Sequence, residues 1–166
     1  MTSSKRRRAG AGITILVDAA PWRKTSGIEK KIFSAALLAL AAERQSAAEI
    51  NILLSDDKHV KALNSQFRGL NKPTNVLSFP SGDDALGAKN SLGDVILGFE
   101  TIARESDEHG KPFVHHAQHL TMHGVLHLLG FDHELEDEAK VMEALETKLC
   151  RRLGIADPYN EADAGN

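Results

Sequence analysis

HGVLHLLGFDH, residues 123–133, is the stretch around which the rest of the chain is organised. On a helix, His123 and His127 are one turn apart, so their imidazoles point to the same side. Gly130 supplies the left-handed backbone conformation that commonly ends a helix, and the chain can then turn back within three residues. That turn would bring His133 to the same point. The stretch therefore predicts a helix end that gathers three imidazole nitrogens.

Three imidazoles suit a borderline metal ion such as Zn²⁺, bound at about 2.0–2.1 Å with the fourth tetrahedral position open to water. An open position is typical of catalytic sites, whereas structural zinc sites are closed by four protein ligands and usually include cysteine. The single cysteine, Cys150, lies well beyond the last histidine. A catalytic metal site is the interpretation that this pattern favours, with a structural site closed by Asp132 as the alternative.

The metal could also bind one turn earlier on the same helix. His115 and His119 continue the stripe that His123 and His127 occupy, and His116 lies beside it. We prefer the later pair, because only that pair has a helix-ending glycine and a third histidine correctly placed beyond it.

The spacing HxxxHxxGxxH is also the frame of the metzincin peptidases, which carry glutamate directly after the first histidine as general base. Gly124 occupies that position here. A peptidase at this site would keep its metal but lose its proton acceptor. A metallopeptidase-like hydrolase is therefore an alternative that the sequence disfavours.

Length and composition indicate one domain in a reducing compartment. The chain has 166 residues, of which 42% are apolar, and this is enough for one hydrophobic core. A single cysteine excludes a disulfide framework. No run approaches the roughly 20 apolar residues of a membrane span, and the basic start is not followed by a signal-peptide pattern. We expect a cytoplasmic protein with no membrane association.

The formal charge of −3 indicates that any RNA contact depends on a local basic patch and not on the overall charge. Four of the basic residues stand together in the tail, at positions 5–8. That tail could assist RNA binding, but a disordered and solvated segment over residues 1–12 is the favoured interpretation.

Hydrophobic periodicity predicts alternating strands and helices within one domain, 13–159. Strands are expected at 13–18, at 47–55, in a short segment before Pro80, and from Asp94. Helices are expected at 26–45 with Ser26 as cap, after a Ser55 cap, at 100–108, at 113–129, and after His133. Residues 81–91 are expected to form a mobile insertion and 160–166 a frayed end.

The segment 67–80, FRGLNKPTNVLSFP, combines a polar loop with a short strand. Gly69 and Pro73 keep the loop out of helix. Hydrogen-bond donors then lie beside one another as a candidate anion-binding and substrate-binding group: Arg68, Lys72, Thr74 and Asn75. A solvated turn is an equally good interpretation of the spacing alone.

Several motifs in one order carry a family resemblance. They are LNSQFRGLNKPTNVLSFP, SLGDVILG, HGVLHLLGFDHELEDEAKVMEALE and the late DPY. Together they span nearly the whole chain, and the combination resembles the bacterial YbeY family of rRNA maturation endoribonucleases.

The resemblance implies an α+β fold: a single zincin-like domain with a mixed sheet of about four strands flanked by helices. It implies one Zn²⁺ per chain, held by His123, His127 and His133, and cleavage of single-stranded RNA. Arg68 matches the family's important arginine, and with His127 it is taken as catalytic. Zinc would acidify water and polarise a phosphate oxygen, while Arg68 stabilised charge on the phosphate. Either water or the ribose 2′-OH could be the nucleophile.

The implied role is maturation of the 16S rRNA 3′ end and ribosome quality control, with rRNA, the small ribosomal subunit and assembly factors as partners. Two other classes of function stay open at this point. One is the metallopeptidase-like hydrolase, which Gly124 disfavours. The other is a non-catalytic ribosome-assembly factor with a structural metal, which the open fourth position disfavours.

Overall fold

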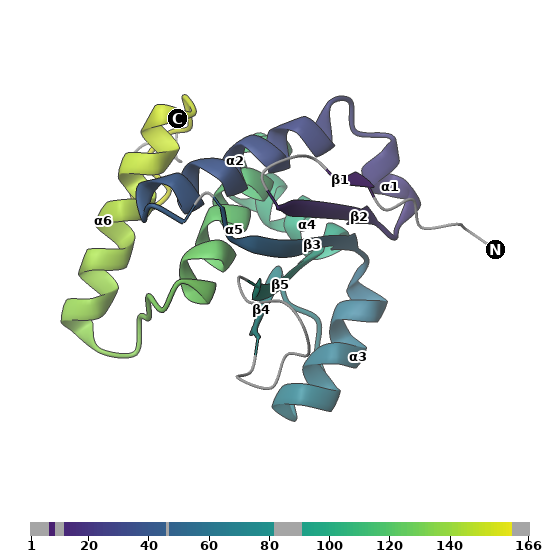
Figure 1. Ribbon diagram of the computed structural model, residues 1–166. Helices are drawn as coiled ribbons and strands as arrows, with labels where there is room; N and C mark the ends of the chain where they lie inside the picture. The colour runs from purple at the N-terminus through teal and green to yellow at the C-terminus, as the bar shows by residue number, and fades with distance from the viewer. Residues whose placement is uncertain (1–6, 9–11, 46, 82–90, 161–166) are drawn as a thin grey trace.

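The computed structural model describes residues 7–8, 12–45, 47–81 and 91–160 (Figure 1). These residues form a five-stranded mixed sheet and six helices in the order β1(Arg7–Arg8), β2(Ile13–Val17), α1(Ala20–Arg23), α2(Ile28–Ala42), β3(Glu49–Ser55), α3(Asp57–Arg68), β4(Val76–Pro80), β5(Ser91–Gly98), α4(Phe99–Glu108), α5(Phe113–Leu128) and α6(Glu136–Arg152). None of these helices is long and apolar enough to cross a lipid bilayer.

The sheet has the strand order β1-β2-β3-β5-β4. The inner strands β2, β3 and β5 are parallel, and β1 and β4 add antiparallel edges. Parallel strands need helical crossovers, which α2 provides between β2 and β3. The expected α+β class and mixed sheet are confirmed, with four longer strands and the two-residue β1 as a fifth.

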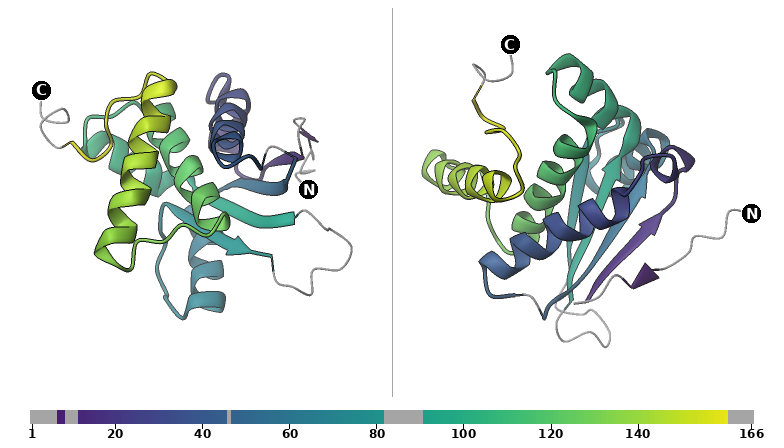
Figure 2. Two further views of the ribbon diagram at one scale, coloured as in Figure 1. Left: turned by 60° about the vertical axis from the view of Figure 1, so that its left-hand side comes forward. Right: turned by 90° about the horizontal axis from the view of Figure 1, so that it is seen from above.

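Helices cover the two faces of the sheet unequally (Figure 2). The larger core lies on the face where α2 and α5 pack, and it includes Ile32, Leu126 and Leu97. On the opposite face, α3 packs Val60 against Ile96 and Leu77 in a smaller cluster. Helix α6 lies outside α5 (Figure 1), and its buried side chains reach the larger core.

Several expected element boundaries differ in the structure. Arg7–Arg8, placed in a disordered tail from sequence, pair with β2 because an edge strand offers free backbone groups. Gly27 and not Ser26 stands at the N-cap of α2. Asp56 caps α3 by accepting the backbone N–H of His59 at 2.8 Å, since Ser55 is the last residue of β3. The expected mobile insertion falls almost entirely outside the described residues, as does most of the expected frayed end.

Helix α5 approaches the sheet unusually closely at Gly124, which is buried. A Cβ atom at this position would lie 2.7 Å from Cγ1 of Val95 and 3.3 Å from Cγ2 of Val76. The Gly124 carbonyl also accepts the hydroxyl of Ser78 at 2.9 Å. Glycine is therefore required here by the distance between α5 and strands β4 and β5.

We predict that Gly124→Ala lowers the free energy of unfolding by about 1 kcal/mol or more, although alanine normally favours a helix interior. The added methyl must displace Val95, which is fully buried. Urea unfolding of metal-free protein measures the change. The double variant Gly124→Ala/Val95→Ala should lose less stability than the sum of the losses of the two single variants, because removing the Val95 side chain removes the clash. Additive costs, or a stabilising Gly124→Ala, would contradict the steric account.

Candidate metal centre

Three histidines meet at the C-terminal end of α5, as the sequence predicts. His123 and His127 come from the last turns of the helix, and their Nε2 atoms are 3.0 Å apart. The helix ends at Leu128 with Leu129 as its C-cap, Gly130 follows with φ of 100°, and the chain turns back. His133 then joins the pair, with one nitrogen from each ring within 4.8 Å of the others.

The ring orientations fit a metal ion bound through Nε2. Nδ1–H of His127 donates to the carbonyl of Phe131 at 3.0 Å, and Nδ1–H of His123 donates to Glu146 at 2.5 Å. A neutral imidazole carries one N–H, so both Nε2 atoms are bare acceptors that face one another. Tetrahedral coordination at about 2.0–2.1 Å separates two ligand nitrogens by roughly 3.3 Å, close to the observed separation. The three side chains therefore fit a divalent metal.

The electrostatics keep His127 ready to bind a cation. Burial lowers the pKa of His127, and the neighbouring His123 and His133 lower it further. His127 therefore stays neutral at pH values where an exposed histidine begins to take up a proton. A neutral ring is the form that binds a metal ion.

A cavity of about 520 Å³ opens beside the histidines. Its walls include Arg68 at the end of α3 and Ser78 on β4. Nη2 of Arg68 donates to the carbonyl of Ser78 at 3.0 Å, and its guanidinium carbon lies 5.8 Å from the centre of the Phe79 ring. The arginine and the three histidines thus face one cavity, although some 55 residues separate them in sequence.

The other predicted substrate contacts are distributed differently. Asn75 lines the cavity, but its amide nitrogen donates to Glu105 at 2.9 Å and anchors the loop to α4. Lys72 and Thr74 are not among the residues that line the cavity. The structure therefore brings Arg68 and Asn75 to the histidines and leaves the other two predicted donors outside.

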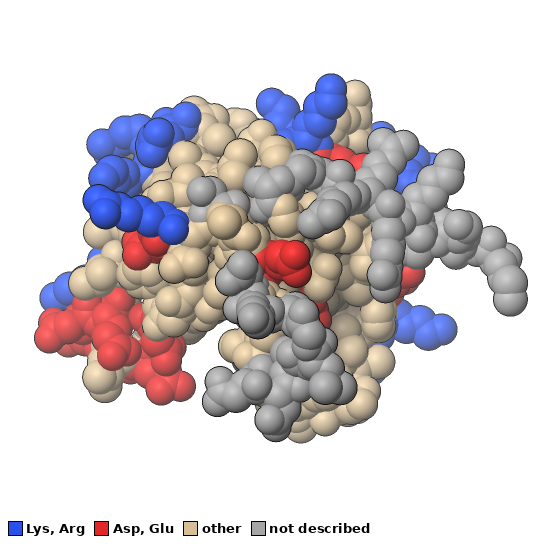
Figure 3. All heavy atoms as spheres, viewed as in Figure 1, with Lys and Arg blue, Asp and Glu red and all other residues tan. Residues whose placement is uncertain are grey.

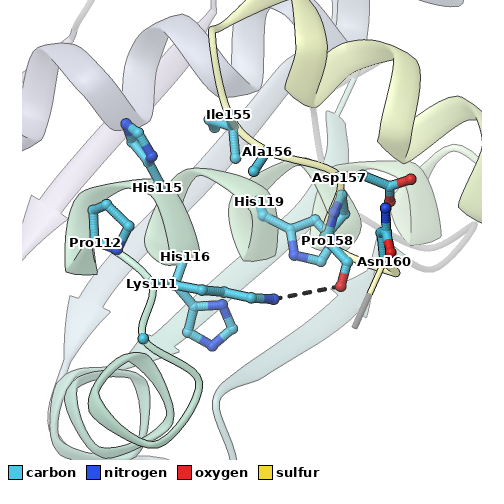
Figure 4. Close-up of a pocket in the computed structure, with 11 residues that line it drawn as sticks. Lys111, Pro112, His115, His116, His119, Ile155, Ala156, Asp157, Pro158 and Asn160 are labelled. Atoms are coloured by element: carbon cyan, nitrogen blue, oxygen red, sulfur yellow. Dashed lines mark hydrogen bonds between the residues drawn. The ribbon is translucent and has the colours of Figure 1, made fainter. Parts of the chain in front are cut away.

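The upstream histidines line a pocket of their own. His115, His116 and His119 line a separate pocket of about 80 Å³ between α5 and the segment 155–160 (Figure 4). His116 is paired with Glu105 at 3.0 Å, and burial lowers its pKa. Among the described residues, the His123, His127 and His133 cluster lies beyond this pocket, and His119 also forms a second group of candidate ligand atoms with His123 and Glu146.

Asp132, considered from sequence as a fourth ligand, also lines the cavity. Its Oδ1 accepts the backbone N–H of His133 at 2.7 Å, so the carboxylate fixes the turn after α5. It is not part of the cluster of three ligand atoms among the described residues. This arrangement favours a site with an open position over a closed structural one.

Glu146 and Tyr159 are part of this region and were not identified from sequence. Glu146 is fully buried on α6. Burial raises the pKa of Glu146, but hydrogen bonds from His119, His123 and Tyr159 outweigh it and hold the pKa at about 2. The sequence did contain a signal for the burial of Glu146, because it stands four residues after Met142 and three before Leu149, on the buried face of the helix.

Charge is segregated along α6 on the face drawn in Figure 3. Acidic side chains gather over its first turn, which contains Glu136, Asp137 and Glu138, and basic ones gather over its last turn, with Arg151 and Arg152. Both groups match the helix dipole. On this face, no continuous basic surface covers the molecule.

Comparison with known proteins identifies the family. The model of the family described as Endoribonuclease YbeY matches residues 20–154. The chain belongs to this family. A protein named Endoribonuclease YbeY from Bradyrhizobium sp. is 46% identical over 160 residues, covering 90% of this chain and 92% of that protein. One from Rhodopseudomonas palustris is 43% identical and covers 90% of this chain and 81% of its own length.

A solved structure supports the fold of this YbeY family member. The solution structure of TM1509 from Thermotoga maritima matches with a TM-score of 0.56 and 22% identity. The match covers 89% of this chain and 99% of that chain. At this identity the likeness shows the fold alone.

We predict that His123→Ala, His127→Ala and His133→Ala each weaken metal binding by more than the 10- to 100-fold typical of an outer-shell change, because each removes a ligand nitrogen. His115→Ala is the matched control and should bind as the wild type does, since His115 lies in the separate pocket. Zinc affinity by chelator competition measures the effect. A loss in His115→Ala equal to the others would show that the metal binds in an earlier register on α5.

Proposed function

We propose that this chain is a zinc-dependent endoribonuclease that cleaves single-stranded RNA. Its proposed role is maturation of the 16S rRNA 3′ end and ribosome quality control, in the cytoplasm, with the small ribosomal subunit and assembly factors as partners. The observation that carries the proposal is the shared cavity of the histidine cluster and Arg68. The names of the relatives, Endoribonuclease YbeY, support the same reaction class.

In this proposal His123, His127 and His133 hold the zinc ion. When bound, zinc supplies a Lewis acid for a phosphate oxygen and increases the acidity of water. Arg68 offers the second contact for the phosphate, because its Nη2 donates to Ser78 and its other N–H groups are not used by that bond. Asn75 positions the loop that follows Arg68 through its hydrogen bond to Glu105.

The alternatives fit the site less well. A peptidase of the metzincin kind needs a glutamate at position 124, where even a Cβ atom would collide with Val95. A structural metal in a non-catalytic assembly factor needs a fourth protein ligand, and Asp132 is engaged with the backbone of His133. The cavity beside the histidines leaves room for a substrate.

The proposal predicts that purified, zinc-loaded protein cleaves single-stranded RNA but neither duplex RNA nor casein. Removing the metal with a chelator should abolish cleavage, and added zinc should restore it. His127→Ala should lose cleavage together with zinc, while His115→Ala keeps both. Cleavage of casein that is sensitive to chelator, or RNA cleavage that survives in His127→Ala, would overturn the assignment.

For Arg68 we predict that Arg68→Ala lowers single-turnover RNA cleavage about 10- to 100-fold, the value of a hydrogen bond to a charged group. Zinc content and melting temperature should change little, since Arg68 is exposed and is not among the cluster of ligands. Arg68→Lys should recover only part of the rate, because lysine keeps the charge but lacks the bidentate fork.

Arg104→Ala is the control for loss of positive charge, since Arg104 is an exposed arginine of α4 outside the cavity. A folded, zinc-loaded Arg68→Ala protein that cleaves at the wild-type rate would remove Arg68 from the active site. A parallel fall of melting temperature and rate would assign Arg68 to holding the β4 backbone through Ser78.

A further inference from the structure

Glu146 is a charged side chain in a place that normally excludes charge. It lies on α6 with an exposed fraction of zero, among the buried apolar residues Met142, Leu149 and Cys150. A buried carboxylate is strongly unfavourable unless it is paired and hydrogen-bonded. A position on this stripe would be filled more stably by leucine or methionine if packing were its only role.

Three donors surround the carboxylate. Nδ1–H of His123 donates to Oε1 at 2.5 Å, and Nε2 of His119 lies 3.3 Å from the same oxygen. The hydroxyl of Tyr159 donates to Oε2. Tyr159 is itself held by its backbone N–H, which donates to Asp157 at 2.9 Å. Elements far apart in sequence therefore converge on one carboxylate directly behind a metal-binding histidine.

The consequence for His123 follows from the chemistry of its ring. A carboxylate can only accept, so the proton of the neutral imidazole is held on Nδ1, and Nε2 is left bare. That bare Nε2 is the atom that faces Nε2 of His127. Carboxylates placed in this way fix the orientation of a metal-binding imidazole and increase its basicity. The two other ligands differ: His127 uses the Phe131 carbonyl, and His133 is exposed.

We propose that Glu146 is a positioning residue of the metal site, which fixes the tautomer and ring orientation of His123, and that Tyr159 and His119 hold Glu146 in place. This inference rests on the metal-dependent function proposed above. The alternative explanation of the same residues is a second metal ion held by His119, His123 and Glu146, whose ligand atoms also lie within 4.8 Å of one another. A metal there would take the Nδ1 atom that now donates to Glu146.

The test compares Glu146→Gln with Glu143→Gln, an exposed position on the same helix. We expect Glu146→Gln to weaken zinc binding about 10- to 100-fold in a chelator competition assay, and Glu143→Gln to bind as the wild type does. Tyr159→Phe removes one of the three donors and should weaken binding by a smaller factor. The wild type should bind one zinc ion per chain.

Nitrogen NMR of the metal-free wild type provides a second measurement, which reports the nitrogen that carries the proton of His123. His123 should carry its proton on Nδ1. A structural role alone would lower the melting temperature of metal-free Glu146→Gln while leaving zinc affinity unchanged. If Glu146→Gln fails to fold, the tautomer of His123 and the affinity of Tyr159→Phe decide the question.

The outcomes separate this inference from the proposed function. A wild type that binds no zinc through the three histidines overturns both. A wild type that binds zinc and cleaves RNA, with a folded Glu146→Gln that binds zinc within twofold, overturns only the role of Glu146. Two zinc ions per chain, with the second lost in Glu146→Gln, would replace the positioning role with a second metal site. A proton on Nε2 of His123 would also overturn the inference.

Discussion

The close contact between α5 and the sheet at Gly124 is the constraint on which the site depends. Ser78 joins the two sides of this contact, because its hydroxyl donates to the Gly124 carbonyl at 2.9 Å and its own carbonyl accepts from Arg68 at 3.0 Å. One residue of β4 therefore connects the helix that carries the histidines with the arginine at the end of α3. A larger side chain at position 124 would separate the two halves of the cavity.

A second requirement is that Nδ1 of His123 and Nδ1 of His127 have acceptors inside the fold. His123 and His127 each donate from Nδ1 to an acceptor inside the fold, which leaves Nε2 free. Burial, together with the nearby Glu146 carboxylate, raises the pKa of the Cys150 thiol to about 12. The thiol is therefore neutral, and Cys150 is part of the buried hydrophobic core. The negative charge in this part of the core is that of Glu146, which its three donors compensate.

The parts of the site that sequence predicted are those set by local geometry. His123, His127 and Gly130 lie within about two helical turns of one another. Their relative positions therefore follow from the helical repeat. Arg68 was placed in a polar loop by its neighbours, but only the packing of β4 against α5 shows that it faces the histidines. Lys72 and Thr74 share its segment and lie outside the cavity lining, because adjacency in a loop does not fix direction.

The sequence alone does not predict the roles of Glu146, Tyr159 and Glu105, because their hydrogen-bond partners come from other elements. The amide of Asn75 and the ring of His116 both contact Glu105, and neither pairing has a local sequence signature. Gly124 was read from sequence as the loss of a catalytic glutamate. In the structure it has a positive role, since the glycine permits the close contact of helix and sheet.

The absence of a carboxylate at position 124 has a different meaning for RNA than for a peptide. A peptide bond has no hydroxyl fixed beside it, so a metzincin-type peptidase activates water with a base on its metal-binding helix, and that side of α5 is filled by Val95, Val76 and Ser78. A ribonucleotide carries a 2′-OH beside its own phosphodiester, so the substrate can supply the attacking group. Two carboxylates, Asp132 and Glu134, do line the cavity. They belong to the turn that also carries His133 and not to the metal-binding helix α5. The packing that excludes a peptidase base is therefore compatible with cleavage of RNA, provided that a cation and an arginine stabilise the charge on the phosphate.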